Sequence, residues 1–368
     1  MIKLITIIIL LFIYNIVIFN IKKIVNVNIK NKYYYDFKGI KLSSDLIKKF
    51  LDYINKSKNG NILNNKNLIK SEYPKVSIVI SMYNRGEFIN STIKSAQNQR
   101  MKDLDIIIVD DFSTDNSKKY VEEAQKLDSR ISLIKNNKKK GTLFCKSIGV
   151  LYSKAKYIHS LDSDDMFCFE NYIEILYNES EKGNYDYFTL DYIIIDLHKK
   201  TIELVEYKNS VILWKKFIKT EIYKKIIYRI GDNILNRGII QSDDHFIDLF
   251  LKDFQYKHLH IAGIFHFIHY KNHQWEKVFF SNETKIKFCE EIIKTIDSIY
   301  TVTENNRKSK LYSFYHLKNL FIKNNCFIIA KIRKKTILTF IKFYKSEFFN
   351  FAEKNYIKKL LRTIGVII

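Results

Sequence analysis

The sequence is short of the residues that several common protein classes need. Its 368 residues include one proline, ten glycines and four cysteines. The cysteines show no CxxC pair and no zinc-finger spacing, which excludes a disulfide framework and a cysteine-based zinc site. We expect free, mostly buried thiols at Cys145, Cys168, Cys289 and Cys326. No glycine-rich phosphate loop occurs, and so few glycines argue against a dinucleotide-binding fold.

Acidic residues are outnumbered by basic ones. The chain has 62 Lys and Arg against 39 Asp and Glu, for a formal net charge of +23. Such an excess can signal nucleic-acid binding. Here the basic residues are scattered, and neither a basic helix interleaved with aromatics nor an RNP-like strand appears. We expect no nucleic-acid partner and leave open a weak attraction to anionic membrane surfaces.

One long apolar run is present, from Leu4 to Ile21. It is just long enough to cross the hydrocarbon core of a bilayer as a helix, and no A-x-A cleavage pattern follows it. Residues 1–25 are therefore predicted to form an uncleaved single-pass membrane anchor, with a cleaved signal peptide as the alternative. Lysines after the run favour a cytoplasmic-facing domain, whereas sequons at Asn55 and Asn282 suit an ER or Golgi lumen, so the side stays open.

The composition and the apolar pattern of the chain then change twice. Residues 26–73 are polar and rich in Asn and Lys, which is typical of a stem or linker. Residues 74–273 begin at the single proline and carry regular strand and helix patterns. Residues 274–368 are basic with apolar positions at helical spacing. We predict that this last region forms amphipathic helices packed on the central domain, or alternatively a membrane-surface or acceptor-binding region.

Strands and helices alternate in the central region. Apolar runs predict strands over 75–83, 104–111, 131–135 and 156–161, and helical spacing predicts helices over 87–99, after residue 115, and over 142–154. This alternation predicts an α/β fold with a mostly parallel sheet and helices on both faces. Ligands bind such sheets at the carboxyl ends of their strands.

Carboxylates gather at two of these strand ends. Asp110 and Asp111 follow "IIIV", while Asp162, Asp164 and Asp165 follow "YIHSL". Clustered carboxylates repel one another and need positive charge nearby. An Asp-x-Asp at a strand end suits Mg²⁺ or Mn²⁺, which take oxygen ligands from carboxylates and substrate phosphates. The alternative is that loop aspartates only cap the next helix, which we favour for Asp115 alone.

The order of these motifs resembles the inverting family 2 glycosyltransferases, which have the GT-A fold. The resemblance spans Pro74 to His273 and rests on "PKVSIVISMYN", "IIIVDDFSTDNS" and "YIHSLDSDDMF". It extends to "LWKKFIKTEIYKK" (213–225) and "QSDDHFIDLFL" (241–251). These motifs together are specific, although none is decisive alone.

The resemblance implies roles for particular residues in holding a nucleotide-sugar donor. Tyr83 would stack on the base and Asp111 would hydrogen-bond it, with Ser81 beside them. Asp162 would lie near the ribose and Asp164 would bind the metal directly, both belonging to the Asp-x-Asp motif. The family commonly has an Arg-Asn pair where this chain has Lys146 and Ser147, and a lysine meets a phosphate only as a point charge. Some relatives place donor-contacting residues at the positions of His266, His269 and His273.

The resemblance also implies the reaction. The catalytic base would be Asp244, preceded by Asp243 where the family usually has Glu. We expect a Mn²⁺- or Mg²⁺-dependent inverting transfer of a sugar, from a UDP-sugar by preference, to a hydroxyl of a glycan, glycoprotein or lipid. Two alternatives remain: a nucleotidyltransferase, and a catalytically inactive, membrane-tethered protein that binds nucleotide sugars.

Overall fold

A computed structural model describes residues 68–196, 201–205, 215–236 and 243–269 of the chain. The predicted anchor, most of the predicted stem and the basic C-terminal region lie outside these residues. Among the helices that are described, none has the length and apolar character needed to span a membrane.

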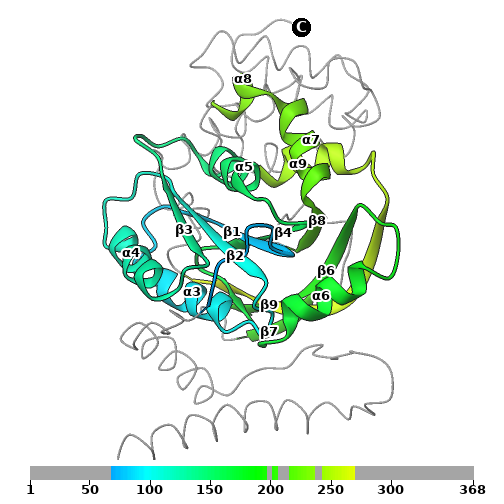
Figure 1. Cartoon of the computed structure of the whole chain (residues 1–368), viewed down its shortest axis with the longest axis horizontal. Helices are drawn as coiled ribbons and strands as arrows, with labels where there is room; N and C mark the ends of the chain where they lie inside the picture. Colours follow the sequence, from blue (N-terminus) through cyan, green and yellow to red (C-terminus); the bar gives the residue numbers. More distant parts are fainter. Residues whose placement is uncertain (1–67, 197–200, 206–214, 237–242, 270–368) are drawn as a thin grey trace, which may run out of the picture.

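Strands and helices alternate through the first half of the described chain, as the apolar pattern predicts (Figure 1). The first half holds β1 (Val76–Met82), α3 (Ile89–Gln97), β2 (Leu104–Asp110), α4 (Ser117–Leu127), β3 (Ile131–Lys135), α5 (Thr142–Tyr152) and β4 (Tyr157–Asp162). The second half holds β5 (Met166–Phe167), α6 (Tyr172–Ser180), β6 (Tyr187–Asp196), β7 (Thr201–Val205), β8 (Lys216–Lys219), α7 (Thr220–Ile230), α8 (Asp232–Leu235), α9 (Asp243–Leu251) and β9 (Tyr256–Ile268).

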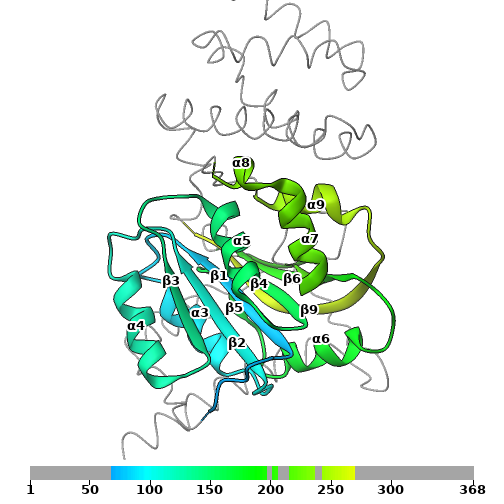
Figure 2. The same ribbon diagram turned by 45° about the horizontal axis from the view of Figure 1, so that its top comes forward.

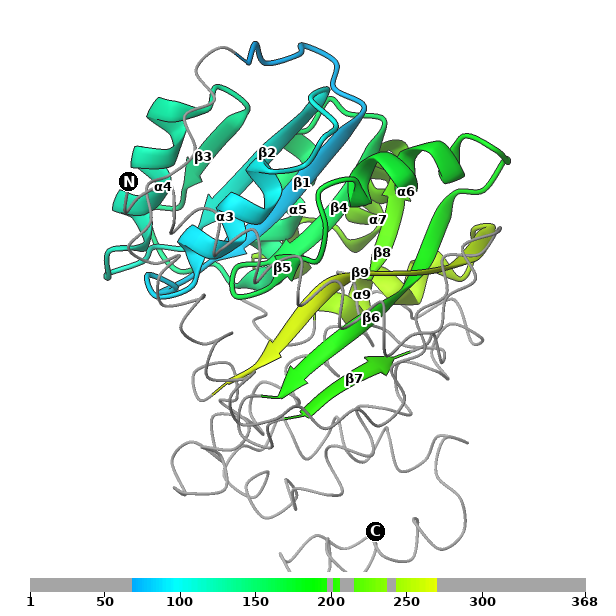
Figure 3. The same cartoon turned by 90° about the horizontal axis from the view of Figure 1, so that it is seen from below.

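All nine described strands belong to one mixed sheet, in the order β3-β2-β1-β4-β8-β6-β9-β5 with β7 beside β6. The first four are parallel, which confirms the predicted parallel sheet for that half. β8 then pairs antiparallel with β4 and with β6, while β9 runs parallel to β6. Figure 3 shows β6 and β9 side by side with β7 beyond them. The local pattern of the sequence did not predict this antiparallel extension.

Helices cover both faces of the sheet, as predicted. α3, α4 and α6 lie on one side, and α5, α7 and α9 lie on the other (Figures 1 and 2). β2 is buried along its whole length, which explains why its sequence is apolar at successive positions and not at alternate ones.

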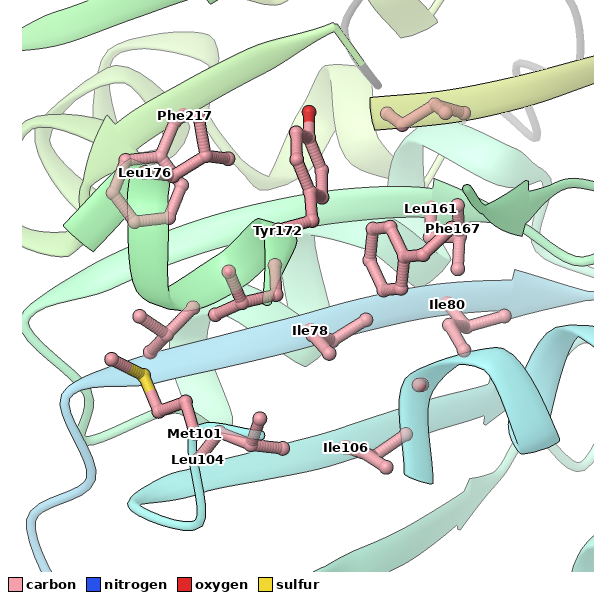
Figure 4. Packing of buried hydrophobic residues seen from close by; sticks show 14 of the residues in the cluster. Ile78, Ile80, Met101, Leu104, Ile106, Leu161, Phe167, Tyr172, Leu176 and Phe217 are labelled. Carbon is pink, nitrogen blue, oxygen red and sulfur yellow. The ribbon is translucent and has the colours of Figure 1, made fainter. Parts of the chain in front are cut away.

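Successive side chains of β1 point to opposite faces of the sheet. Ile78 and Ile80 join the main core with Tyr172 and Leu176 of α6 (Figure 4). Val79 points to the opposite face, where a Cβ added to Gly149 of α5 would come within 2.5 Å of it. Glycine therefore lets α5 approach the sheet closely, and α5 carries Lys146 toward the carboxyl end of β4.

Two local details bear on the predictions for Asp115 and for the cysteines. Helix α4 begins at Ser117, and its N-cap residue is Asn116, which makes no side-chain capping bond. Asp115 nonetheless accepts hydrogen bonds from the backbone N–H of Ser117 at 2.9 Å and of Gly86 at 2.9 Å, so its predicted structural role at this helix start is confirmed. Cys145 and Cys168, the two cysteines among the described residues, are free thiols.

His159 in β4 is a fully buried imidazole in the core. Its Nδ1 lies 2.9 Å from the Ser160 carbonyl and its Nε2 lies 3.3 Å from the Tyr172 hydroxyl. Burial lowers the pKa of His159 from 6.5 to about 4. The unfolded chain therefore takes up a proton at His159 between pH 6.5 and 4 while the folded chain does not.

We predict that this difference weakens the fold in acid. The contribution of His159 to stability is present above pH 6.5 and is lost as the pH falls to 4, at a cost of about 3 kcal/mol. In urea unfolding at pH 7 and pH 4, His159→Gln should lose less stability over this interval than the unmodified chain does. Equal losses would show that His159 is not the titrating group.

Candidate active site

The sheet brings the two predicted acidic clusters to one edge. β2 and β4 flank β1 on either side, so Ser81 is aligned with Val109 of β2 and with Asp162 of β4. Asp110 ends β2 and Asp162 ends β4. The ends of β2 and β4 therefore lie on either side of Ser81, at the same edge of the sheet.

Residues 162–165 form a tight turn, which we call the acidic turn. The backbone N–H of Asp165 donates to the Asp162 carbonyl at 3.0 Å, and the Thr92 hydroxyl donates to the Ser163 carbonyl at 3.1 Å. Three carboxylates are thereby held close together next to a buried strand. Such an arrangement needs positive charge, and the structure supplies it from four basic side chains on three other elements.

Asp164 receives charge from two of these side chains. Its Oδ2 lies 3.2 Å from Nε of Arg85, which follows β1, and 3.3 Å from Nε2 of His269, which follows β9. Burial opposes ionisation of the carboxyl group, but His269, Arg85 and His266 together outweigh it and lower the pKa of Asp164 below its usual range. Asp164 is therefore an anion in the folded protein.

Asp165 is the most deeply buried of the three carboxyl groups. Nδ1 of His266 lies 3.0 Å from its Oδ2, and the backbone N–H of Phe267 donates to Oδ1 at 3.1 Å. Burial raises the pKa of Asp165. Burial alone would lower the pKa of His266, but the neighbouring carboxylates raise it. His266, whose side chain is 25% exposed, therefore serves as the cation of this pair and holds β9 against the acidic turn.

Asp162 is partly exposed and faces Lys146. The Lys146 Nζ lies 3.2 Å from Asp162 Oδ1, while the lysine side chain itself is 3% exposed. The chain thus places a buried ammonium group where the resemblance implies a phosphate contact.

Asp111 is the residue predicted to hydrogen-bond the nucleobase of the donor. In the structure its carboxylate holds the neighbouring loop in place. Its carboxylate accepts hydrogen bonds from Asn136 Nδ2 at 3.0 Å and from the backbone N–H groups of Lys140 at 2.7 Å and Gly141 at 2.9 Å. The loop between β3 and α5 is therefore tied to the end of β2. Tyr83 lies beneath this loop, with the Lys139 ammonium 3.7 Å from its ring centroid.

Two residues at this edge adopt left-handed backbone conformations without being glycine. Asn84 has φ of 50° and Phe112 has φ of 68°. Such conformations are sparsely populated and cluster at functional sites. Thr114 N–H donates to Asn84 Oδ1 at 2.8 Å, which links the loops after β1 and β2. Phe112 is half exposed beside Asp111.

Asp243 and Asp244 are the first residues of α9, as the resemblance implies for the catalytic base. Their side chains lie outside the described part of the structure. The helix itself is fixed to the sheet, because Asp248 Oδ1 lies 3.3 Å from Nζ of the buried Lys216 on β8. His273 also lies outside the described residues.

The acidic turn has oxygen ligands that suit a divalent cation. Mg²⁺ and Mn²⁺ prefer carboxylate oxygens, and Mg²⁺ is usually held by one or two carboxylates plus phosphate oxygens. Asp162 and Asp164 fit this pattern. Within the described ranges the turn brings no three Asp, Glu, His or Cys ligand atoms close together, so the remaining ligands would have to come from the donor and solvent.

Sequence reasoning missed Arg85 and the distribution of the basic groups. Arg85 is the first basic residue after β1, and its position directly after a strand next to β4, which ends in the acidic turn, is the signal that could have found it. The pairing of His266 with Asp165 and of His269 with Asp164 depends on β9 lying beside β5. No local pattern predicts this contact between distant parts of the chain.

Comparison with known proteins identifies the family. Residues 77–242 match the model of glycosyl transferase family 2. The UDP-Glc:alpha-D-GlcNAc-diphosphoundecaprenol beta-1,3-glucosyltransferase WfaP of Escherichia coli is 32% identical over 195 residues, covering 48% of this chain and 76% of that protein. The chain belongs to glycosyl transferase family 2. It is a glycosyltransferase that uses a nucleotide-sugar donor, which confirms the family predicted from the motifs.

Other similarities cover less or are more distant. The GalNAc(5)-diNAcBac-PP-undecaprenol beta-1,3-glucosyltransferase of Campylobacter jejuni is 40% identical over 93 residues, covering 25% of this chain and 30% of that protein. The crystal structure of S. aureus TarS 1-349 in complex with UDP aligns with 78% of this chain and 91% of its own, at 12% identity and a TM-score of 0.47.

We predict that a pair within the acidic turn and a pair at the surface differ in their effect on folding. Asp165→Asn removes the buried anion that faces His266, and breaking a pair in this way costs about 3 kcal/mol. Asp253→Asn makes the same chemical change in the exposed pair with Arg229, and should cost about 1 kcal/mol or less. Urea unfolding of both variants measures the difference. Equal costs would contradict the assignment of His266 and Asp165 as the structural pair.

Proposed function

We propose that this glycosyltransferase is metal-dependent and inverting, and that it moves a sugar from a UDP-sugar to a hydroxyl group of a lipid-linked glycan. The observation that supports this most directly is the acidic turn at the end of β4, which lies beside Ser81 at the carboxyl ends of the parallel strands. Glycan, glycoprotein and simple lipid acceptors are all within the chemistry of the site. The names of the Escherichia coli and Campylobacter jejuni relatives favour a lipid-linked glycan.

The nucleotide end of the donor would lie over β1 and β2. Tyr83 offers a ring for stacking on the base, and Ser81 lies beside it. Asp111 holds the loop that carries Lys139 and would make the predicted hydrogen bond to the nucleobase. Asp162, at the end of β4, would face the ribose.

The diphosphate would lie against the acidic turn and its basic neighbours. Asp164, with Asp162, would hold Mg²⁺ or Mn²⁺, which when bound supplies Lewis-acid stabilisation of the departing diphosphate. Arg85 and Lys146 now pair with these two carboxylates and are positioned to exchange that contact for phosphate oxygens. Preorganised cations of this kind stabilise charge that develops in the transition state.

The acceptor side would be organised by α9. Asp244 would take the proton of the acceptor hydroxyl as its oxygen bonds to the anomeric carbon. The bond between that carbon and the diphosphate oxygen breaks, and its electron pair leaves with the nucleoside diphosphate. Asp243 would support Asp244 at the start of the helix. A direct displacement inverts the anomeric configuration.

The membrane location is part of the same proposal. Residues 1–25 would form a single-pass anchor and place the catalytic domain at a membrane surface, where a lipid-linked acceptor resides. Either the cytoplasmic or the lumenal side is compatible with this arrangement. Protease protection of membrane vesicles would distinguish the two.

The first test is donor turnover by the full chain in detergent, with UDP- and GDP-sugars compared in Mn²⁺, Mg²⁺ and EDTA. We expect hydrolysis of a UDP-sugar in the presence of metal and its loss in EDTA. Asp164→Asn should reduce turnover by about 100-fold or more, because it removes a charge needed in the transition state. Asp253→Asn, an exposed aspartate paired with Arg229, is the matched control and should keep full activity.

One further variant separates donor binding from the transfer reaction. Asp244→Asn should retain UDP-sugar binding in calorimetry while losing transfer to a lipid-linked acceptor. Binding without turnover in the unmodified chain, under every metal condition, would instead favour the inactive binding protein. Release of pyrophosphate from a nucleoside triphosphate and a sugar phosphate would favour the nucleotidyltransferase.

A further inference from the structure

A second group of metal-binding side chains lies on the extension of the sheet, outside the acidic turn. Asp191 of β6 and His258 and His260 of β9 place one ligand atom each within 4.8 Å of one another. We call these three residues the β6/β9 cluster. His258 Nε2 lies 3.0 Å from Asp191 Oδ1, and His260 Nδ1 lies 3.2 Å from Asp191 Oδ2.

The strand pairing is interrupted where Asp191 lies. Leu190 is aligned with Leu259, but Asp191 is aligned with Ala262, so His260 and Ile261 are inserted into β9 opposite a single step of β6. A further shift follows between Asp191 and Ile193. Bulges of this kind re-aim side chains and occur next to functional sites. This one leaves both imidazoles of β9 at the same carboxylate.

One member of the cluster is oriented by a neighbour that is not itself a ligand. The Thr189 hydroxyl lies 2.9 Å from His258 Nδ1. A partner at one ring nitrogen fixes the orientation of the imidazole and leaves the other nitrogen to face a metal. Here that other nitrogen is Nε2, which is the atom facing Asp191.

The three side chains of the β6/β9 cluster differ in their exposure to solvent. The side chain of Asp191 is 6% exposed, that of His258 is 18% exposed and that of His260 is 55% exposed. The carboxylate is therefore shielded while the outer imidazole borders solvent. A cation could enter from that side and keep a water ligand at the open position.

We propose that Asp191, His258 and His260 bind a zinc ion. Two imidazoles and one carboxylate form a donor set that zinc uses, with a fourth position open. Zinc bonds of about 2.0 to 2.1 Å place neighbouring ligand atoms of a tetrahedron about 3.3 Å apart, which is near the two separations between nitrogen and oxygen given above. Imidazole ligands also distinguish this site from the acidic turn, whose carboxylates suit Mg²⁺ or Mn²⁺.

A bound zinc would join β6 to β9. The same strand β9 carries His266, which pairs with Asp165, so the ion would fix the strand that completes the acidic turn. Its expected role is structural, and the proposal does not depend on the identity of the donor or acceptor. The alternative is that Asp191 is only a hydrogen-bonding partner of the two imidazoles.

The test is zinc binding by the full, untagged chain in detergent, after EDTA has been removed. We expect one zinc per chain by elemental analysis, a rise in the unfolding temperature with ZnCl₂, and a tetrahedral visible spectrum when Co²⁺ replaces zinc. His260→Ala should abolish these three signals. Because His260 is exposed, we expect this variant to fold as the unmodified chain does. Asp191→Asn should do the same where it folds.

Three further variants test whether zinc binding is specific to the β6/β9 cluster. Thr189→Val preserves the shape of the buried side chain and all three ligands, and should weaken zinc binding by about 10-fold. Lys257→Arg, on the same strand, and Asp164→Asn, in the acidic turn, should bind zinc as the unmodified chain does. The proposal is overturned if the unmodified chain takes up no zinc, or if His260→Ala takes up as much as the unmodified chain.

Discussion

The structure depends on one electrostatic constraint, which is the accumulation of three carboxylates in four residues directly after a buried strand. Water reaches little of the Asp164 side chain, which is 9% exposed, and none of the Asp165 side chain. The chain meets the constraint with Arg85 from the loop after β1, Lys146 from α5, and His266 and His269 from β9 and the residue after it. Three separate elements must therefore be in place before the acidic turn is stable, so the turn couples the parallel half of the sheet to its antiparallel extension.

The same constraint connects stability with catalysis. A site built to hold a metal and a diphosphate needs negative ligands for the cation and positive ligands for the phosphates, all before the donor arrives. In the proposed reaction the carboxylates of the turn would meet the first requirement and Arg85 and Lys146 the second, since each of these cations now pairs with a carboxylate that a metal would take over. The pair of His266 and Asp165 is different in kind. Its carboxyl group is fully buried, and the contact with His266 attaches the acidic turn to β9.

Most of the parallel half of the fold was predictable because its signals are local. The run "ISLIK" forms β3 with the predicted bounds, and the strand ends that carry Asp110 and Asp162 lie where the apolar runs stop. The pairing of β6 with β8 and β9 was not predictable, since it joins segments far apart in the chain and β9 has no strict alternation. For the same reason the sequence indicated that the acidic cluster needed positive charge but did not identify Arg85 as a source. Lys146 was expected to meet a phosphate, and the structure adds its contact with Asp162.

The irregular course of β9 has a physical reason that links the two polar clusters of the sheet. A regular parallel pairing with β6 would align His260 with Asp191 and would carry every later residue of β9 further along β6. The inserted residues around His260 and the second shift near Ile193 instead bring Phe265 opposite both Ile193 and Met166. His266 then follows at the level of Asp165. The two polar clusters therefore constrain each other through the register of one strand, and a change that straightened β9 at Asp191 would also displace His266 from the acidic turn.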